Sequence, residues 1–303
     1  MNMKQLQYVL VLSQAGSFSK AADILNISQP SLSQYIKKIE AQVGVELFDR
    51  LNGNVRLTDA GMVYVDIGRQ ILDLEHQMEN RLSDLANNKS GTVKLGISPY
   101  RSFHMIPDIL KKFNQLFPNV TLIVTEKSGS DLIDAAEHGD FDLCIIALPI
   151  DSPNFNYEII SSEELLVAVN IHSDLYNRLS LNSRKIDNRI YPVIDITLVN
   201  GADFAVLNNM MPMYHFTEKA LTEFNVTVNK KIEVNSIEAL CSVVRSEVCA
   251  SFVPSGVANP DSNEIQFFSL AQDLHLRDIA VIYRKNQYLS EPIKQLIQIL
   301  HHL

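Results

Sequence analysis

The chain has 303 residues with a net charge of −9 at pH 7, and hydrophobic residues make up 46% of it. This length and apolar content suit two or three folded domains and exclude an intrinsically disordered chain. No apolar run approaches the roughly 18 to 20 residues of a membrane helix, and the N-terminal segment has helical periodicity rather than the pattern of a secretory signal, so we expect a cytoplasmic protein without membrane contact.

The cysteine and histidine residues predict neither a metal site nor thioredoxin-like chemistry. The three cysteines, Cys144, Cys241 and Cys249, are far apart, and no C-x-x-C or H-x-x-x-H pair occurs. Cys144 and Cys249 lie in apolar runs, where a free cysteine acts as a small hydrophobe, with redox sensing as the alternative. We therefore expect no metal and no cofactor.

Charge is distributed unevenly along the chain. Residues 1–58 carry six basic and four acidic residues, a net charge of +2, which leaves −11 on the remainder of a chain whose total is −9. A mildly basic segment on an acidic body confines the attraction for a polyanion to that segment and limits nonspecific binding. The first 58 residues are therefore the candidate nucleic-acid-binding part.

The N-terminal segment shows the pattern of three helices, of which the last two form a helix-turn-helix. Apolar residues at helical spacing predict the first helix, and Ser17 can cap a second helix that runs to about Leu25. Asn26 tolerates the left-handed conformation and so ends that helix. Ser28 is a good N-cap for the third helix, and Pro30 suits its first turn because a missing N–H costs nothing there.

The third helix directs a row of polar residues outward. A Gln side chain can form two hydrogen bonds with adenine in the major groove, and Ser and Lys side chains suit phosphate oxygens. From this segment alone, an ordinary solvated helix face is the alternative. The residues of this helix that we expect to contact DNA are Ser28, Gln29, Pro30, Ser31, Ser33, Gln34 and Lys37.

A hairpin is predicted directly after the helix-turn-helix. Asn52-Gly53 lies between two short runs of alternating apolar residues, which is a strong signal for a two-residue hairpin turn. A hairpin in this place is a wing, and Arg50 and Arg56 on it would reach the DNA backbone or minor groove. Solvated surface is the alternative for these two arginines.

Thr58 begins a long helix that ends near residues 87–91. Apolar residues recur at alternating four- and three-residue steps, the heptad pattern of a helix that packs against another helix. The positions are Ala60, Tyr64, Ile67, Ile71, Leu74, Met78, Arg81 and Leu85, of which only Arg81 is not apolar. We expect a second copy to cover this seam in a two-fold dimer; packing against the chain's own body is the alternative.

From Thr92 onward, strands alternate with helices, which predicts two α/β lobes with a cleft between them. Ligands of open α/β sheets bind beyond the carboxyl ends of the strands, and helix starts there favour an anion. Ser128 and Asp131 have the spacing of a capping box. Arg101 is either exposed or binds a negative ligand group, because a cation at a helix N-terminus opposes the helix dipole. The residues that we expect at this ligand site are Ser98, Pro99, Tyr100, Arg101, Ser128, Ser130 and Asn208.

Over its full length, the chain resembles the LysR family of transcriptional regulators. The matching residues are Phe18-Ser19, Ala21-Ala22, Ser28-Gln29-Pro30, Ser33, Ile36, Glu40, Gly44, Leu47-Phe48, Arg50, Leu57-Thr58, Ala60-Gly61 and, later, Gly139 with Phe141-Asp142. The resemblance implies a winged helix-turn-helix, a linker helix used in dimerisation, and two lobes of periplasmic-binding-protein type that hold a small effector. It also implies that tetramers are usual.

These observations predict an α/β protein with three parts. Residues 1–58 form the DNA-binding domain, 59–89 the linker helix and 90–303 the effector-binding domain, in which lobe I spans about 92–161 and 267–303 and lobe II about 162–266. The expected partners are double-stranded DNA, a small effector with a carboxylate or other anionic group, further copies in a homodimer or homotetramer, and RNA polymerase.

The sequence departs from the family pattern in three places. Gln34 stands where the family usually has Arg in the recognition helix, which points to a different base preference. Ser246-Glu247-Val248 replaces the usual Gly-rich turn, and Arg101 lies in a loop that is more often small or apolar, which favours an anionic effector.

An enzyme and a plain solute-binding protein are the competing functions. The chain has no Gly-rich phosphate loop, no G-x-S-x-G and no metal-ligand cluster, and the paired carboxylates Glu163-Glu164 have the appearance of solvated surface. A solute-binding protein would need export, and the DNA-binding segment argues against it. We therefore predict a regulator with no catalytic residues.

Overall fold

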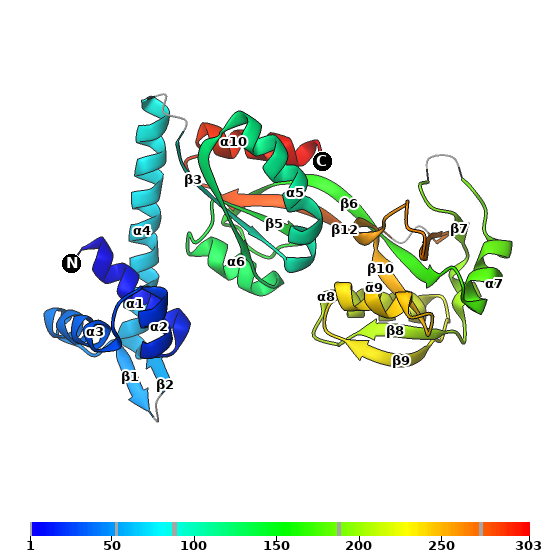
Figure 1. Cartoon of the computed structure of the whole chain (residues 1–303), viewed down its shortest axis with the longest axis horizontal. Coiled ribbons are helices and arrows are strands. Elements are labelled where there is room, and N and C mark those ends of the chain that lie inside the picture. Colours follow the sequence, from blue (N-terminus) through cyan, green and yellow to red (C-terminus); the bar gives the residue numbers. More distant parts are fainter. Residues whose placement is uncertain (1, 52–53, 87–89, 187–188, 273–274) are drawn as a thin grey trace.

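The computed structural model describes residues 2–51, 54–86, 90–186, 189–272 and 275–303 (Figure 1). An N-terminal helical domain is joined by one long helix to two α/β lobes that lie side by side. No helix among the described residues is both long and apolar enough to cross a membrane.

The N-terminal domain is the predicted helix-turn-helix with a two-stranded wing. Its elements are α1 (Met3–Ala15), α2 (Phe18–Ile24), α3 (Gln29–Val43), β1 (Phe48–Leu51) and β2 (Asn54–Leu57). The two strands pair antiparallel with Leu51 opposite Asn54, so the predicted two-residue turn, Asn52-Gly53, is consistent with the register but lies outside the described residues. Ala21 and Ala22 are buried among the apolar side chains of α1 and α3.

Local backbone chemistry sets the turn between α2 and α3. Asn26 has φ 51°, the left-handed conformation expected of it, and the Ser28 hydroxyl accepts a hydrogen bond from the Ser31 N–H at 3.3 Å. Ser17 occupies the N-cap position of α2, but its side chain forms no capping hydrogen bond there. The Glu40 carboxylate accepts from the N–H groups of Leu47 and Phe48, which ties the wing to α3.

The linker helix α4 (Asp59–Leu85) has two different faces. Thr58 caps it by accepting from the Gly61 N–H at 3.0 Å. At the start of the predicted seam, Ala60 and Tyr64 pack on the core of the N-terminal domain. Farther along, Leu74 is 65% exposed and Met78 55% exposed, so this apolar face is uncovered in the single chain.

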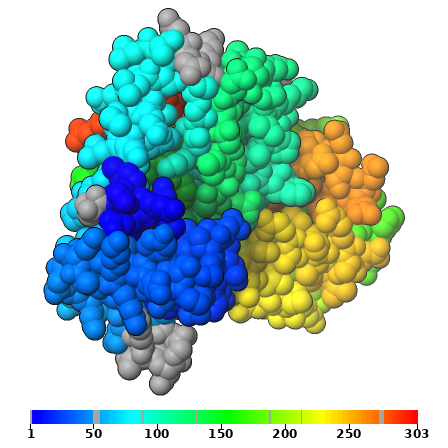
Figure 2. Space-filling view, turned by 60° about the vertical axis from the view of Figure 1, so that its left-hand side comes forward, coloured from blue at the N-terminus to red at the C-terminus, as the bar shows by residue number. Residues whose placement is uncertain are grey.

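The opposite face of α4 is polar and packs against lobe I of the same chain. Figure 2 shows the cyan helix against the green surface of lobe I, and the contacts between them include Asp73 with Arg284 at 2.6 Å and His76 with Asp142 at 3.1 Å. Packing on the same chain and packing on a second copy therefore involve different faces of α4. The polar face packs on lobe I of the same chain, and the apolar face is exposed.

The two lobes share one long strand. Lobe I contains β3 (Ser90–Ile97), α5 (Pro99–Leu116), β4 (Asn119–Glu126), α6 (Gly129–Glu137), β5 (Leu143–Ala147) and α10 (Glu291–His301). Lobe II contains α7 (Asp174–Asn182), β7 (Val193–Ile194), η1 (Ile196–Val199), β8 (Asp203–Leu207), α8 (Pro212–Glu223), β9 (Asn229–Val234), α9 (Ile237–Arg245), β10 (Ala250–Pro254), η2 (Ser255–Val257) and β11 (Ile265–Leu270). Strands β6 (Phe155–Asn170) and β12 (His275–Arg284) run between them as an antiparallel pair.

The strand order is β4-β3-β5-β12-β6-β10-β8-β9, with β11 pairing with β6 and β7. Strand β11 spans the predicted lobe boundary at residues 266 and 267, and it pairs with the lobe II part of β6. Each lobe has an apolar core, one around Phe113 in lobe I and one around Phe204 in lobe II.

Several predicted elements have different limits in the structure. Helix α5 begins at Pro99, so Arg101, which was expected in a loop, lies in the first helical turn. Strand β6 is 16 residues long and includes the polar run 161–164, which lacks the apolar pattern of a strand. Helix α7 was not predicted. The capping box at Ser128 is wrong: its hydroxyl donates to the Asp131 carboxylate and caps no backbone N–H.

Candidate ligand pocket and nucleic-acid interface

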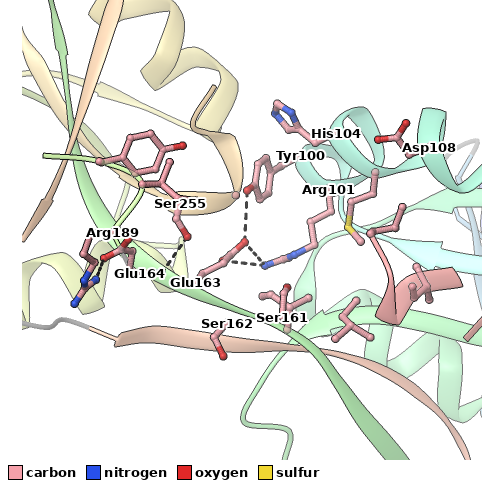
Figure 3. Close-up of a pocket in the computed structure, with 18 residues that line it drawn as sticks. Tyr100, Arg101, His104, Asp108, Ser161, Ser162, Glu163, Glu164, Arg189 and Ser255 are labelled. Atoms are coloured by element: carbon pink, nitrogen blue, oxygen red, sulfur yellow. Dashed lines mark hydrogen bonds and ion pairs between the residues drawn. The ribbon is translucent and has the colours of Figure 1, made fainter. Parts of the chain in front are cut away.

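A cavity of about 640 Å³ lies where the two lobes meet the crossover strand β6 (Figure 3). One wall is the face of α5 that carries Tyr100, His104 and Asp108, which are spaced four residues apart and so lie on one side of the helix. Residues 160–164 of β6 form the floor, and Tyr191 and Ser255 come from lobe II. A volume in this range suits a small organic ligand.

Three charged side chains meet in the wall of this pocket. The guanidinium of Arg101 lies 3.3 Å (Nη2) from one carboxylate oxygen of Glu163 and 3.5 Å from the other. Arg277, from β12, donates to the same carboxylate through Nε at 2.8 Å. Two cations thus share one anion, and both Arg101 and Glu163 are buried.

Not all hydrogen-bond donors of Arg101 have a partner among the described residues. Its Nη1 donates to the Ser98 hydroxyl at 3.3 Å, but its Nε is buried without a hydrogen-bond partner among the described residues. Burial lowers the pKa of Arg101, and the nearby Glu163 opposes that shift. The expectation that Arg101 is simply exposed is therefore wrong, because its side chain is buried beside Glu163.

Lobe II closes tightly onto this cluster through Gly256. A Cβ atom built at Gly256 would lie 2.4 Å from the Tyr100 hydroxyl and 2.9 Å from a carboxylate oxygen of Glu163. The Tyr100 hydroxyl in turn lies 3.5 Å from Glu163, and burial raises the pKa of Tyr100. The absence of a side chain at residue 256 is what lets the lobe II backbone approach.

The next residue of the strand joins lobe II by a second ion pair. Glu164 pairs with Arg189 and accepts a hydrogen bond from the Ser269 hydroxyl at 3.1 Å. Its backbone N–H donates to the Ser255 hydroxyl at 3.1 Å. The interpretation of Glu163-Glu164 as solvated surface is wrong, because both carboxylates are engaged and Glu163 is only 6% exposed.

The rest of the pocket combines polar and apolar side chains. Burial lowers the pKa of His104, which favours a neutral imidazole, although Glu238 opposes the shift. Besides Arg101, a ligand here would meet the charged residues Asp108, Glu164 and Arg189 and an apolar surface. The apolar lining residues are Met105, Ile160, Ile190, Tyr191, Ile279, Leu300 and Leu303.

Only two of the residues expected at the ligand site, Tyr100 and Arg101, line this cavity. Ser98 occupies the N-cap position of α5 without a side-chain capping bond and accepts a hydrogen bond from Arg101, and Pro99 is exposed on the first turn. Ser128 is exposed at the start of α6, and Asn208 hydrogen-bonds with Asn235 at the end of β8. The side chain of Ser130 lies outside the described residues.

The residues at the pocket that the sequence missed include Glu163, Glu164, Arg189, Ser255, Gly256 and Arg277. The available signal for the first two was a run of four polar residues, 161–164, directly before an apolar strand. No local signal marks the others, because their role depends on contacts across many residues of sequence.

The expected DNA-contacting residues lie together along one side of α3. Leu32, Ile36 and Ile39 face the core and are buried. Gln29, Pro30, Gln34 and Lys37 are exposed, whereas Ser31 and Ser33 are partly covered. The Ser28 hydroxyl is already engaged with Ser31 as the helix cap. On the wing, Arg56 is exposed, and the side chain of Arg50 lies outside the described residues.

Comparison with known families gives two matches that divide the chain between them. The family described as LysR substrate binding domain matches residues 86–303, and the family described as bacterial regulatory helix-turn-helix protein, lysR family, matches residues 3–62. The chain is 26% identical over 299 residues to the uncharacterized HTH-type transcriptional regulator YcgK of Bacillus subtilis, covering 96% of this chain and 91% of the relative.

A second relative is the hydrogen peroxide-inducible genes activator of Haemophilus influenzae, 26% identical over 286 residues, which are 94% of this chain and 91% of the relative. Among solved structures, full-length CbnR complexed with its target DNA matches with a TM-score of 0.68 at 18% identity, over 100% of this chain and 99% of that one. A full-length variant of OxyR from Pseudomonas aeruginosa matches with a TM-score of 0.70 at 22% identity, over 100% and 94% of the two chains. At these identities the structural matches establish the fold.

Proposed function

This chain belongs to the LysR family of transcriptional regulators, and we propose that a small anionic molecule bound between its lobes controls how its helix-turn-helix engages DNA. The family is one of regulators rather than enzymes, and its second domain binds an effector. The observation that carries the anionic character is Arg101, a buried cation in the pocket wall whose Nε has no hydrogen-bond partner among the described residues. Arg101 shares its one anionic partner, Glu163, with Arg277, so a further anion is the complementary ligand.

We propose that α3 enters the major groove and that its exposed residues make different kinds of contact with DNA. Gln29 and Gln34 can contact base edges, whereas Lys37 and the wing residue Arg56 can contact phosphates. Ser28, Pro30, Ser31 and Ser33 would position the helix start against the backbone. Because a DNA-bound regulator acts beside the promoter, RNA polymerase is an expected partner and the cytoplasm the expected location.

The exposed apolar face of α4 supports a homodimer. The seam residues Ile67, Leu74 and Met78 are each at least half exposed in the single chain. Such a face is unfavourable in water, and a second copy of the helix covers it with the heptad spacing it already has. A dimer presents two recognition helices to the two half-sites of its DNA, and pairing of dimers would give a tetramer.

Peroxide sensing, which the names of some relatives indicate, finds no support in the thiols of this chain. Burial is the main cause that raises the pKa of Cys144, Cys241 and Cys249. The thiolate is the reactive form, so raised pKa values disfavour reaction with peroxide. Ligand binding in the pocket is therefore better supported than thiol oxidation as the signal to which the protein responds.

The proposal is tested by measuring DNA binding and ligand binding together. A cytosolic metabolite extract, separated by charge, is screened for fractions that raise the melting temperature of the full chain, since a bound ligand stabilises by mass action. Active fractions should be retained by an anion exchanger and should change the gel-shift pattern on the protein's own promoter. Activity confined to the neutral or cationic fractions would exclude the anionic effector.

A further inference from the structure

Glu163 holds its two arginines unequally. Its contact with Arg277, 2.8 Å, has the length of a strong charge-assisted hydrogen bond, whereas its contacts with Arg101, 3.3 and 3.5 Å, are longer. The carboxylate is therefore anchored on Arg277, next to it on the paired strand β12. Arg101, which comes from α5 of lobe I, is held only loosely.

Arg101 can donate further hydrogen bonds beyond those it makes to Ser98 and Glu163. A guanidinium has five N–H donors in a fixed fork. In Arg101, Nη1 reaches Ser98, Nη2 reaches Glu163 through the two long contacts, and Nε has no partner among the described residues. The two arginines share one glutamate, so an arriving anionic group can pair with Arg101.

We propose that Glu163 is an internal competitor, which occupies Arg101 until an effector binds and then yields Arg101 to an anionic group of that effector. This inference rests on the proposed function, in which the pocket takes an anion. The arriving group takes the Arg101 fork, and Glu163 keeps Arg277. The apolar part of the lining, which includes Met105, Ile279 and Leu300, can pack against the body of the ligand.

The exchange of partners at Arg101 also couples ligand binding to the arrangement of the lobes. Glu163 lies on the strand that joins them, Arg101 belongs to lobe I, and the Gly256 backbone of lobe II packs against Glu163 and Tyr100. Replacing the Arg101–Glu163 contact with a ligand contact removes one tie between lobe I and the crossover strand. A ligand that prefers the released arrangement shifts the population toward it.

The test uses phenylacetate as the probe, a monoanion with an apolar body, and its neutral analogue phenylacetamide. Binding to the full chain is measured by calorimetry for wild type, Glu163→Gln, Arg101→Gln and Glu158→Gln. The last is the matched control, because Glu158 lies on the same strand outside the pocket lining. Removing the competitor should tighten phenylacetate binding in Glu163→Gln by about ten-fold. The control should match wild type, Arg101→Gln should lose the binding, and phenylacetamide should not distinguish wild type from Glu163→Gln.

A second variant covers the case in which Glu163→Gln does not fold. Glu163→Asp keeps the negative charge but shortens the side chain by about 1.5 Å, so it can stay on Arg277 and withdraw from Arg101. It should also bind phenylacetate more tightly than wild type. Equal or weaker binding by the folded variants, or no binding by any of them, overturns the competition.

The outcomes separate this inference from the function on which it rests. If phenylacetate binds wild type and is lost in Arg101→Gln, but gains nothing in Glu163→Gln or Glu163→Asp, the anion site stands and the competition fails. If binding is unchanged in Arg101→Gln, the anion site itself fails, and with it the proposed effector class.

Discussion

His76 of the linker helix lies 3.1 Å from Asp142 of lobe I, measured from Nε2 to Oδ2, and both side chains are buried. The same carboxylate oxygen accepts from the Lys94 backbone N–H at 2.8 Å, and Gln287 donates to the carbonyl and the other carboxylate oxygen of Asp142. Asp142 therefore joins the linker helix to the sheet of lobe I. Through this contact the sensor domain holds the helix that carries the DNA-binding domain.

Loss of the Asp142 charge should loosen this joint. In Asp142→Asn an amide N–H₂ replaces one acceptor, so buried donors of His76, Lys94 or Gln287 lose their partner, at a cost of about 1–3 kcal/mol in the free energy of unfolding. Urea unfolding of the full chain measures it. The control is Asp66→Asn on the same helix, whose partner is His138 and whose side chain is 57% exposed; it should change stability by less than about 1 kcal/mol. Equal effects of the two variants would contradict the role of Asp142.

A charge on the open face of α4 should weaken the dimer. Met78 is 55% exposed in the single chain, and burying an apolar side chain of this size contributes about 1.5–3 kcal/mol. Met78→Glu should therefore shift the protein toward monomer in size-exclusion chromatography with light scattering. Leu181→Glu, at an 86% exposed position in lobe II, is the control and should leave the mass unchanged. A dimer that persists in Met78→Glu at low concentration would show that another surface holds it.

Two exposed residues of α3 should affect DNA binding in different ways. Gln29→Ala should lower discrimination among operator variants by about 1–3 kcal/mol at one base pair, because a base contact is lost. Lys37→Ala should weaken all sequences alike and reduce the salt dependence, because a phosphate contact is lost. Fluorescence anisotropy at several salt concentrations separates the two. Unchanged discrimination in Gln29→Ala would remove this residue from base readout.

The three cysteines should be slow to react at neutral pH. Their raised pKa values keep the thiols protonated at a pH where an ordinary cysteine is partly ionised, so alkylation by iodoacetamide should be slower than for a free thiol and should accelerate only at higher pH. Mass spectrometry of the folded chain follows the modification. Millimolar peroxide should leave DNA binding unchanged; a response abolished by replacing one cysteine with serine would instead identify a redox input.

Glu247 should gain stability from replacement by glycine. Its φ is 67°, a left-handed conformation that costs an L-residue about 1–2 kcal/mol, and its side chain is exposed. The greater freedom of glycine in the unfolded chain offsets part of this, so Glu247→Gly should stabilise by about 0.5–1 kcal/mol in urea unfolding. Glu223→Gly, at the last residue of α8 and without a positive φ, is the contrast and should not stabilise.

The N-terminal domain and the linker helix were predictable from the sequence because local chemistry determines them. Asn26, Ser28 and Thr58 end or cap helices through hydrogen bonds and backbone angles within a few residues of themselves. The heptad spacing of α4 likewise predicted its apolar face. The sequence did not show that the other face of the same helix, at Asp73 and His76, packs on lobe I. A polar residue in a sequence gives no sign of whether it is solvated or buried in a contact.

The ligand pocket was decided by the tertiary structure. Alone in the sequence, Glu163 resembles solvated surface and Arg101 a residue in an exposed loop. The fold brings them together across 62 residues and adds Arg277 from 114 residues away. The sequence determined which charges exist and which helices and strands carry them. Whether a charge is solvated or buried beside a partner depends on contacts distant in the chain, and these exist only once the two lobes close on their shared strand.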